Sequence, residues 1–135
     1  MVKRYDCLKL LASWMDEHML TVTSFSANYR EWYSLWNRGA NFYAFNMGMC
    51  IPFALGLCLA FPKRRVIALD SDGSLLLDTS SLVTVAEVNP PNLVAIVFDN
   101  RVYGRRMGPT ATAGAPIWPR WLRGRGSGKQ APCSP

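Results

Sequence analysis

The sequence predicts an α/β fold in which a parallel sheet carries helices on both faces. Three observations predict it: two uninterrupted apolar runs at residues 66–69 and 93–98, a helical segment at 79–88 between them, and Pro90 and Pro91, which end that helix. Apolar runs without alternation are typical of strands that are covered on both faces, as in parallel sheets. The strand, helix and strand order predicts a right-handed crossover.

The elements upstream of this unit follow from spacing and residue type. Residues 2–18 place apolar side chains at three- and four-residue intervals, which predicts an amphipathic helix. The β-branched stretch 20–23 predicts a strand. From Met47 onward, small and apolar residues predict a helix that residues 62–65 end with a proline and three basic side chains.

Residues 28–41 combine aromatic and polar side chains, and two interpretations remain open. One is a short helix that packs its rings beneath a loop. The other is a recognition surface, in which exposed rings with Arg30 and Arg38 form an interface or the mouth of an anionic-substrate site.

The net charge of +6 comes from one end of the chain. Residues 1–100 hold eight Lys/Arg and nine Asp/Glu (−1), whereas residues 101–135 hold seven Lys/Arg and no acid (+7). The folded part is therefore nearly neutral, so we expect no nucleic-acid partner for it. The apolar run 47–61 is too short to span a bilayer unaided, so no membrane partner is expected.

Cysteine and histidine usage indicates no dedicated redox or acid–base site. The four cysteines lack a C-x-x-C spacing and follow no secretory leader, so we expect reduced thiols in a soluble, cytoplasmic protein. Cys50 and Cys58 lie in an apolar helical stretch, where a free cysteine behaves as a small hydrophobe. His18, at the end of the first helix, fits a helix-end residue better than an acid–base catalyst.

Polar clusters follow both apolar runs of the strand–helix–strand unit. Residues 70–74 read D-S-D-G-S and residues 99–100 read D-N, so both clusters lie at strand carboxyl ends, where α/β sheets bind ligands. Asp72 and Asn100 offer the oxygen ligands that Mg²⁺ prefers. Gly73 allows a sharp turn and a close approach to phosphate, and Ser74 adds a hydroxyl. Each signal alone also fits an ordinary polar turn, and their joint spacing is the stronger evidence.

With this spacing the chain resembles the thiamine-diphosphate enzymes, whose signature is G-D-G, about two dozen residues, then N-N. The resemblance covers roughly residues 3–110 and includes the N-M-G-M segment before the signature. Within that superfamily it looks most like the β-type subunits of sulfopyruvate decarboxylase and like phosphonopyruvate decarboxylase, through P-K-R-R-V-I-A-L-D-S-D-G-S-L-L, N-P-P-N-L and D-N-R-V-Y-G. It implies the cofactor-binding PP-type domain, with thiamine diphosphate and Mg²⁺ as cofactors.

The resemblance also implies roles for individual residues. Asp72, the Asn100 side chain and the Val102 carbonyl would ligate Mg²⁺. Gly73 and Ser74 would hold the diphosphate. Met47, with Gly48 beside it, matches the apolar residue that buttresses the folded cofactor, although Met47 alone would also fit ordinary core packing. Tyr103 and Gly104 match the cap after the metal loop.

The implied activity is decarboxylation of a small 2-oxo acid such as phosphonopyruvate or sulfopyruvate. An α-type subunit with the pyrimidine-binding domain would supply the activating glutamate, which makes a hetero-oligomer the expected assembly. No catalytic residue is therefore assigned to this chain. Two alternatives are another carboligase or decarboxylase subunit of the superfamily and a non-catalytic remnant.

Three residues depart from the family pattern. Asp99 replaces the first Asn of the N-N pair, which this subgroup tolerates. Ser71 replaces the first glycine of G-D-G, at a cost of about 1 kcal/mol if that position needs a positive φ or close packing. Arg101 lies between two metal-contacting residues where the subgroup prefers glycine, and would either reach an anionic substrate group or repel the metal.

The sequence divides into an incomplete PP-type domain at 1–113 and a basic, disordered tail at 114–135. The tail shows no periodicity where relatives continue with helix and strand. A GC-rich coding sequence for A-P-I-W-P-R-W-L reads T-D-L-A-A-M-A one frame over, so we hypothesise a frameshift that truncates the domain. The alternative is a genuine disordered extension that contacts nucleic-acid phosphates.

Overall fold

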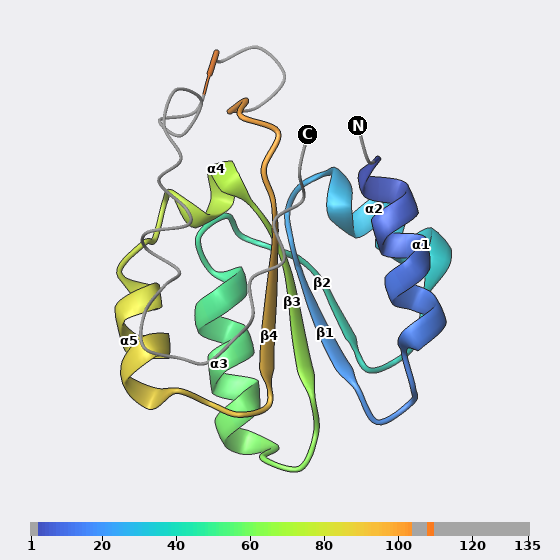
Figure 1. Cartoon of the computed structure of the whole chain (residues 1–135), viewed down its shortest axis with the longest axis vertical. Helices are drawn as coiled ribbons and strands as arrows, with labels where there is room; N and C mark the ends of the chain where they lie inside the picture. Colours follow the sequence, from blue (N-terminus) through green and yellow to red (C-terminus); the bar gives the residue numbers. More distant parts are fainter. Residues whose placement is uncertain (1–2, 104–107, 110–135) are drawn as a thin grey trace.

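One parallel sheet organises the chain (Figure 1), and the computed structural model describes residues 3–103 and 108–109. In this part of the chain the sheet has four strands in the order β2-β1-β3-β4, all parallel. The strands are β1 (Leu20–Ser24), β2 (Asn41–Phe45), β3 (Val66–Ser71) and β4 (Leu93–Phe98). The predicted fold class is confirmed.

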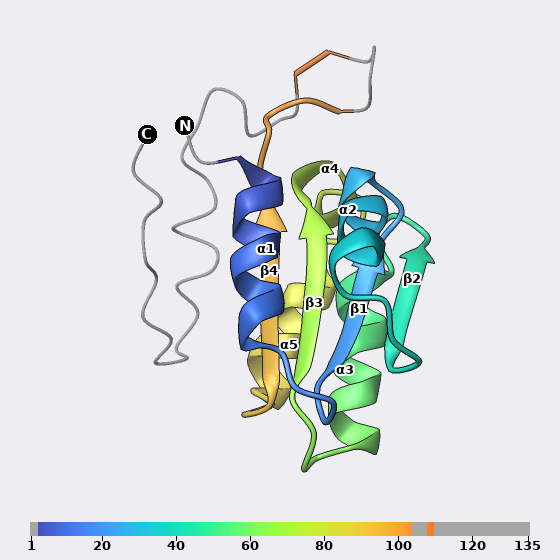
Figure 2. The same cartoon turned by 90° about the vertical axis from the view of Figure 1, so that its right-hand side faces the viewer.

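Helices cover both faces of this sheet (Figure 2). Helices α1 (Arg4–Trp14) and α2 (Ala27–Leu35) pack on one face, and α3 (Cys50–Ala60) and α5 (Ser81–Val88) pack on the other. The one-turn helix α4 (Asp72–Leu75) follows β3 directly at the carboxyl edge of the sheet. Pro52 is tolerated in the first turn of α3, where a backbone N–H has no intrahelical partner.

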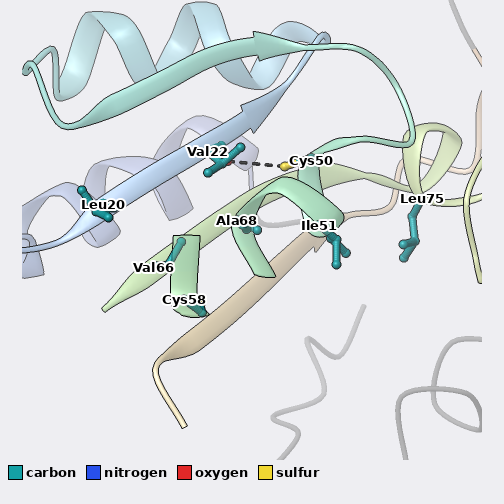
Figure 3. Close-up of a cluster of buried hydrophobic side chains, with 9 residues drawn as sticks. Leu20, Val22, Cys50, Ile51, Cys58, Val66, Ala68 and Leu75 are labelled. Atoms are coloured by element: carbon teal, nitrogen blue, oxygen red, sulfur yellow. Dashed lines mark hydrogen bonds between the residues drawn. The ribbon is translucent and has the colours of Figure 1, made fainter. Parts of the chain in front are cut away.

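Each face of the sheet has its own apolar core. The core between α3 and the sheet contains Val22, Ala68 and Cys50, and Figure 3 shows their close packing. The opposite core joins Leu8 of α1 and Trp32 of α2 to Ile67 and Leu69 of β3. The alternation along β3 sends successive side chains into the two cores, as the pleat of a strand requires.

The last strand, β4, is less covered than its apolar sequence suggests. Every residue of β1 is buried, and β3 is buried except for Ser71, but β4 has exposed positions at Val94 and Ala95. Among the described strands β4 lies at the edge of the sheet, so only one neighbouring strand, β3, pairs with it. The expectation of full cover on both faces is therefore wrong for this strand.

The aromatic segment 28–41 forms a helix and leads into a strand that the sequence analysis did not predict. The expected short helix is α2, and Trp32 is fully buried and donates its Nε1–H to Thr21 Oγ1 at 3.0 Å. Beyond it, residues 41–45 pair with β1, with Thr21 opposite Asn41. Pairing with a distant strand, which no local pattern encodes, makes this segment β2.

The first helix is shorter than predicted, and the reason is a local turn. It ends at Trp14, and the Asp16 carboxylate accepts hydrogen bonds from the backbone N–H groups of His18 and Met19 at 2.8 and 3.1 Å. An Asp side chain that caps backbone groups in this way competes with helix continuation. His18 therefore lies after the helix, at the amino end of β1.

Cys7, Cys50 and Cys58 are free thiols, and the latter two are buried as predicted. No helix among residues 3–103 has the length and apolar character needed to cross a membrane. The predicted tail at 114–135 and Gly104 lie outside the described residues.

Candidate functional site

The two polar clusters leave the same edge of the sheet side by side. Strands β3 and β4 pair in parallel, with Asp70 opposite Val97 and Ser71 opposite Phe98. Asp72 directly follows β3, and Asp99 directly follows β4. The predicted meeting of the two clusters at one carboxyl edge is confirmed.

The neighbours of Gly73 leave too little space for a side chain at this position. A Cβ atom built there would lie 2.9 Å from Cδ2 of Tyr103 and 3.8 Å from Cε of Met47. Real Cβ contacts essentially never come as close as 2.9 Å, so only glycine fits without displacing the ring. Gly73 itself sits in helix α4 and not in a left-handed turn. Three predicted site residues, Met47, Gly73 and Tyr103, are thus gathered at one point.

Ser71 fits its position without backbone strain. Its φ and ψ are −124° and 157°, an extended conformation that any residue adopts. The cost considered for a serine in place of the first signature glycine would have required a positive φ or close packing. The φ contribution to that cost is absent.

Gly48 joins the segment before α3 to the turn after β3. Its φ of +85° lies in the left-handed region that favours glycine. Its backbone N–H donates to Ser74 Oγ at 3.0 Å, and an added Cβ would lie 3.4 Å from the Cβ atoms of Leu77 and Asp78. Ser74 is completely buried, so this hydrogen bond holds together two segments that are 26 residues apart.

The carboxyl of Asp70 is buried and is not among the site residues predicted from the sequence. Asp70 ends the apolar run of β3 and is 1% exposed, and its Oδ1 accepts the Ser71 N–H at 2.8 Å. Burial raises the pKa of the Asp70 carboxyl, while the hydrogen bond from the Ser71 N–H acts in the opposite direction. The available signal was an acidic residue directly continuing an apolar strand, a position where an apolar side chain is expected.

Asn28 and Cys50 both contact the backbone at the end of β3. The Asn28 Nδ2 group donates to the Asp70 backbone carbonyl at 2.9 Å and so ties α2 to the end of β3. Burial raises the pKa of the Cys50 thiol, and the Asp70 charge adds to that shift. Its S–H contacts the carbonyls of Val22 and Leu69 at 3.5 and 3.7 Å, so Cys50 packs as a neutral thiol under the site.

The loop after β4 is shaped by its own side chains. Asp99 Oδ1 accepts the Arg101 N–H, and Asn100 Oδ1 accepts the Val102 N–H, both at 2.9 Å. Arg101 has a φ of +59°, in the left-handed region where glycine is preferred. The Tyr103 N–H donates to the Gly108 carbonyl at 3.0 Å, which brings the chain back on itself.

The chemistry of this edge fits a diphosphate with a hard cation. Asp72, Asn100 and the Val102 carbonyl offer only oxygen ligands, the type that Mg²⁺ takes together with phosphates and water. The Asn100 oxygen keeps a second lone pair beside its bond to Val102. Within the described residues, no group of three His, Cys, Asp or Glu side chains is placed to hold a metal ion.

Comparisons with known proteins point to one family. The model for "Thiamine pyrophosphate enzyme, C-terminal TPP binding domain" matches residues 18–115. Sulfopyruvate decarboxylase subunit beta of Methanothermobacter thermautotrophicus is 35% identical over 76% of this chain and 55% of its own length. Phosphonopyruvate decarboxylase of Streptomyces viridochromogenes is 36% identical over 74% of this chain and 25% of its own length.

A solved structure shows the same fold. Benzoylformate decarboxylase from Polynucleobacter necessarius superimposes with a TM-score of 0.63 at 20% identity, over 76% of this chain and 21% of that chain. This chain thus spans about half of the first relative, a quarter of the second and a fifth of the solved structure.

Proposed function

Because this chain belongs to the thiamine pyrophosphate enzymes through their C-terminal TPP-binding domain, we propose that it is the Mg²⁺- and thiamine-diphosphate-binding subunit of a 2-oxo acid decarboxylase. One observation carries the proposal. The signature residues after β3 and β4 meet at a single edge, with Met47 and Tyr103 both beside Gly73.

Each residue at this edge has a part in the proposed site. Asp72, Asn100 and the Val102 carbonyl would hold Mg²⁺. Gly73 and Ser74 would receive the diphosphate, since the bare Gly73 backbone lets a ligand approach closely. Met47 would support the cofactor from the side, and Tyr103 would cover the loop. When bound, thiamine diphosphate supplies the electron sink that decarboxylation of a 2-oxo acid requires.

The names of two relatives support a substrate class. The names of two similar proteins are sulfopyruvate decarboxylase and phosphonopyruvate decarboxylase, and both substrates are 2-oxo acids with a second anionic group. We propose a substrate of this class.

A partner subunit is part of the proposal. Large apolar side chains that follow β1, precede α3, follow α4 and follow β4 are 45–58% exposed around the site: Phe25, Met49, Leu77 and Val102. An exposed apolar rim of this kind fits a protein–protein interface. A pyrimidine-domain subunit seated on this rim would complete the site and contribute the activating glutamate, in a hetero-oligomer.

The test is calorimetric titration of thiamine diphosphate with Mg²⁺ into the full chain mixed with its candidate α-type subunit. We expect saturable binding for the native chain and an affinity at least about 100-fold lower for Asp72→Asn, which keeps the shape and removes the charged metal ligand. Asp16→Asn, in the turn before β1, is the matched control and should bind like the native chain.

Two results would contradict the proposal. One is equal binding by Asp72→Asn and the native chain. The other is no saturable heat from a mixture that sedimentation shows to be a folded complex.

A further inference from the structure

The start of helix α2 carries an aromatic and cationic cluster that the proposed cofactor contacts do not use. The rings of Phe25 and Tyr29 stack, with their centroids 5.8 Å apart and their planes inclined by 20°. The Arg30 guanidinium lies 5.7 Å from the centroid of the Tyr29 ring, and its Nε–H donates to Tyr29 Oη at 3.1 Å. Phe25, Tyr29 and Arg30 together form the α2 cluster.

The α2 cluster lies at the carboxyl edge of the sheet, where the candidate site also lies. Phe25 directly follows β1, and its backbone N–H donates to the Phe45 carbonyl at the end of β2, at 2.7 Å. In the first turn of α2, the Asn28 side chain binds the Asp70 carbonyl at the end of β3. Figure 2 shows α4 and the start of α2 at the same end of the sheet. A subunit that covers this edge would therefore meet the α2 cluster as well.

The positive charge of Arg30 has no carboxylate within ion-pairing distance in the described part of the chain. Its sequence neighbour Glu31 accepts two hydrogen bonds from Arg4, at 2.7 and 2.8 Å, in an ion pair that joins α1 to α2. Arg30 is exposed and lies near the amino end of α2, where the helix dipole favours negative charge. A cation at this end of a helix is locally unfavourable, so its position fits a role in binding an anionic group.

The α2 cluster also has the composition and the order of an interface anchor. Tyrosine and arginine are enriched among the residues that contribute most of the binding energy at protein interfaces. Phe25 is 58% exposed, and so presents apolar surface beside the charge. The Tyr29 ring and hydroxyl already hold Arg30, which lowers the entropy that this long side chain would lose on binding.

We propose that the α2 cluster anchors the α-type subunit, which places a carboxylate side chain on Arg30 and an apolar side chain against Phe25. This inference rests on the proposed function, in which that subunit covers the carboxyl edge. Phe25 already belongs to the exposed apolar rim around the site. The α2 cluster extends this rim along α2 and adds a charge-specific contact to it.

The second arginine of the aromatic segment, Arg38, supplies a matched control. Its guanidinium lies 4.2 Å from the centroid of the Trp36 ring, so both arginines stack on an aromatic side chain. Both are also exposed. Arg38 lies in the segment before β2, at the amino edge of the sheet, whereas Arg30 lies at the carboxyl edge. The substitution Arg38→Gln therefore removes the same charge and the same kind of contact at the opposite end of the sheet.

The test measures binding of the full chain to the candidate α-type subunit by biolayer interferometry, without cofactor. The native chain is compared with Arg30→Gln, Tyr29→Phe and Arg38→Gln, and circular dichroism checks that each variant is folded. Affinities and association rate constants are measured at about 0.1 M and about 1 M NaCl, between which the Debye length shortens from about 10 Å to about 3 Å. A charge that steers association makes the association rate fall as salt rises.

We expect Arg30→Gln to weaken the complex by about tenfold or more, as for an arginine at the centre of an interface, and to reduce the salt dependence of association. Tyr29→Phe keeps the ring stack and removes the hydroxyl that holds Arg30, so it should weaken the complex by about threefold. Arg38→Gln should match the native chain in both affinity and salt dependence.

Three results would overturn the inference. The first is native affinity for Arg30→Gln, and the second is an unchanged salt dependence of association in that variant. The third is an equal loss for Arg30→Gln and Arg38→Gln, which would indicate a general effect of net charge. In each of these cases the native complex still forms and the proposed function stands. If the native chain forms no complex with the subunit, the proposed hetero-oligomer is itself contradicted and the inference fails with it.

Discussion

Single residues in this protein are constrained by space as much as by hydrogen bonding, and Gly73 is the clearest case. Its missing Cβ leaves room for the Tyr103 ring on one side and for Met47 on the other. A ligand that approaches this backbone must use the same space. The identity of residue 73 therefore affects both packing and binding.

Replacing Gly73 by alanine should disrupt the site. The new Cβ would press on the Tyr103 ring, and overpacking of this kind costs about 1–3 kcal/mol. We expect a lower free energy of unfolding by denaturant titration, together with weaker cofactor binding. Gly56→Ala in helix α3 is the matched control, because nothing lies within 4 Å of its Cβ position, and it should stabilise by about 0.5–1 kcal/mol. Equal effects of the two substitutions would refute this explanation.

Arg101 is constrained by backbone conformation. With φ at +59° it occupies the left-handed region, which costs a non-glycine residue about 1–2 kcal/mol. We expect Arg101→Gly to be more stable than Arg101→Ala by about 1 kcal/mol in thermal unfolding, since both remove the charge and only glycine relieves the backbone. If the two variants melted together, the strain argument would be wrong.

At the scale of elements, the termini of the helices show how local chemistry defines their ends. Helix α2 begins after Ser26, whose Oγ accepts the Asn28 N–H at 3.2 Å. Helix α1 begins after Lys3, whose side chain makes no capping hydrogen bond. Because Asn28 also holds the end of β3, the start of α2 matters to the site as well as to the helix.

Ser26→Ala should lower the free energy of unfolding by about 1 kcal/mol, the usual value of a serine N-cap. The comparable substitution Lys3→Ala at the start of α1 should change it by less than about 0.5 kcal/mol. Urea unfolding followed by circular dichroism measures both. A loss for Lys3→Ala as large as that for Ser26→Ala would rule out capping as the cause.

Across the whole molecule, the least protected part of the described sheet is its β4 edge. Val94 is 40% exposed and shares its strand face with Ile96 and Phe98, which pack against the α1 and α2 core. Exposed apolar edge strands invite pairing with another chain. We therefore expect this edge to promote self-association when the chain is isolated.

Val94→Lys should reduce self-association of the isolated chain, because a charge on an edge strand disfavours edge-to-edge pairing. We expect the association constant to fall by about tenfold, or about 1.4 kcal/mol, in sedimentation equilibrium. Val83→Lys adds the same charge at an exposed position of α5, away from any strand, and should have no such effect. An equal fall for both would indicate a general effect of net charge.

The sequence by itself determined the order and type of most elements and the site motif. The apolar runs of β3 and β4 and the breaks at Pro62 and Pro90 are local signals, which depend only on neighbouring residues. The polar residues after each strand could be placed at one edge because parallel strands share a carboxyl end. This reasoning predicts Asp72 and Asn100 at the candidate site, whereas the prediction of Met47 depends on the resemblance to the thiamine-diphosphate enzymes.

Only the tertiary structure decided which distant segments meet. Strand β2 exists because residues 41–45 pair with β1, and β1 lies between β2 and β3 although it precedes both in sequence. The contact of Gly73 with Tyr103 and the hydrogen bond between Gly48 and Ser74 likewise join residues through space. Such contacts depend on how the two cores pack, and local spacing carries no information about that packing.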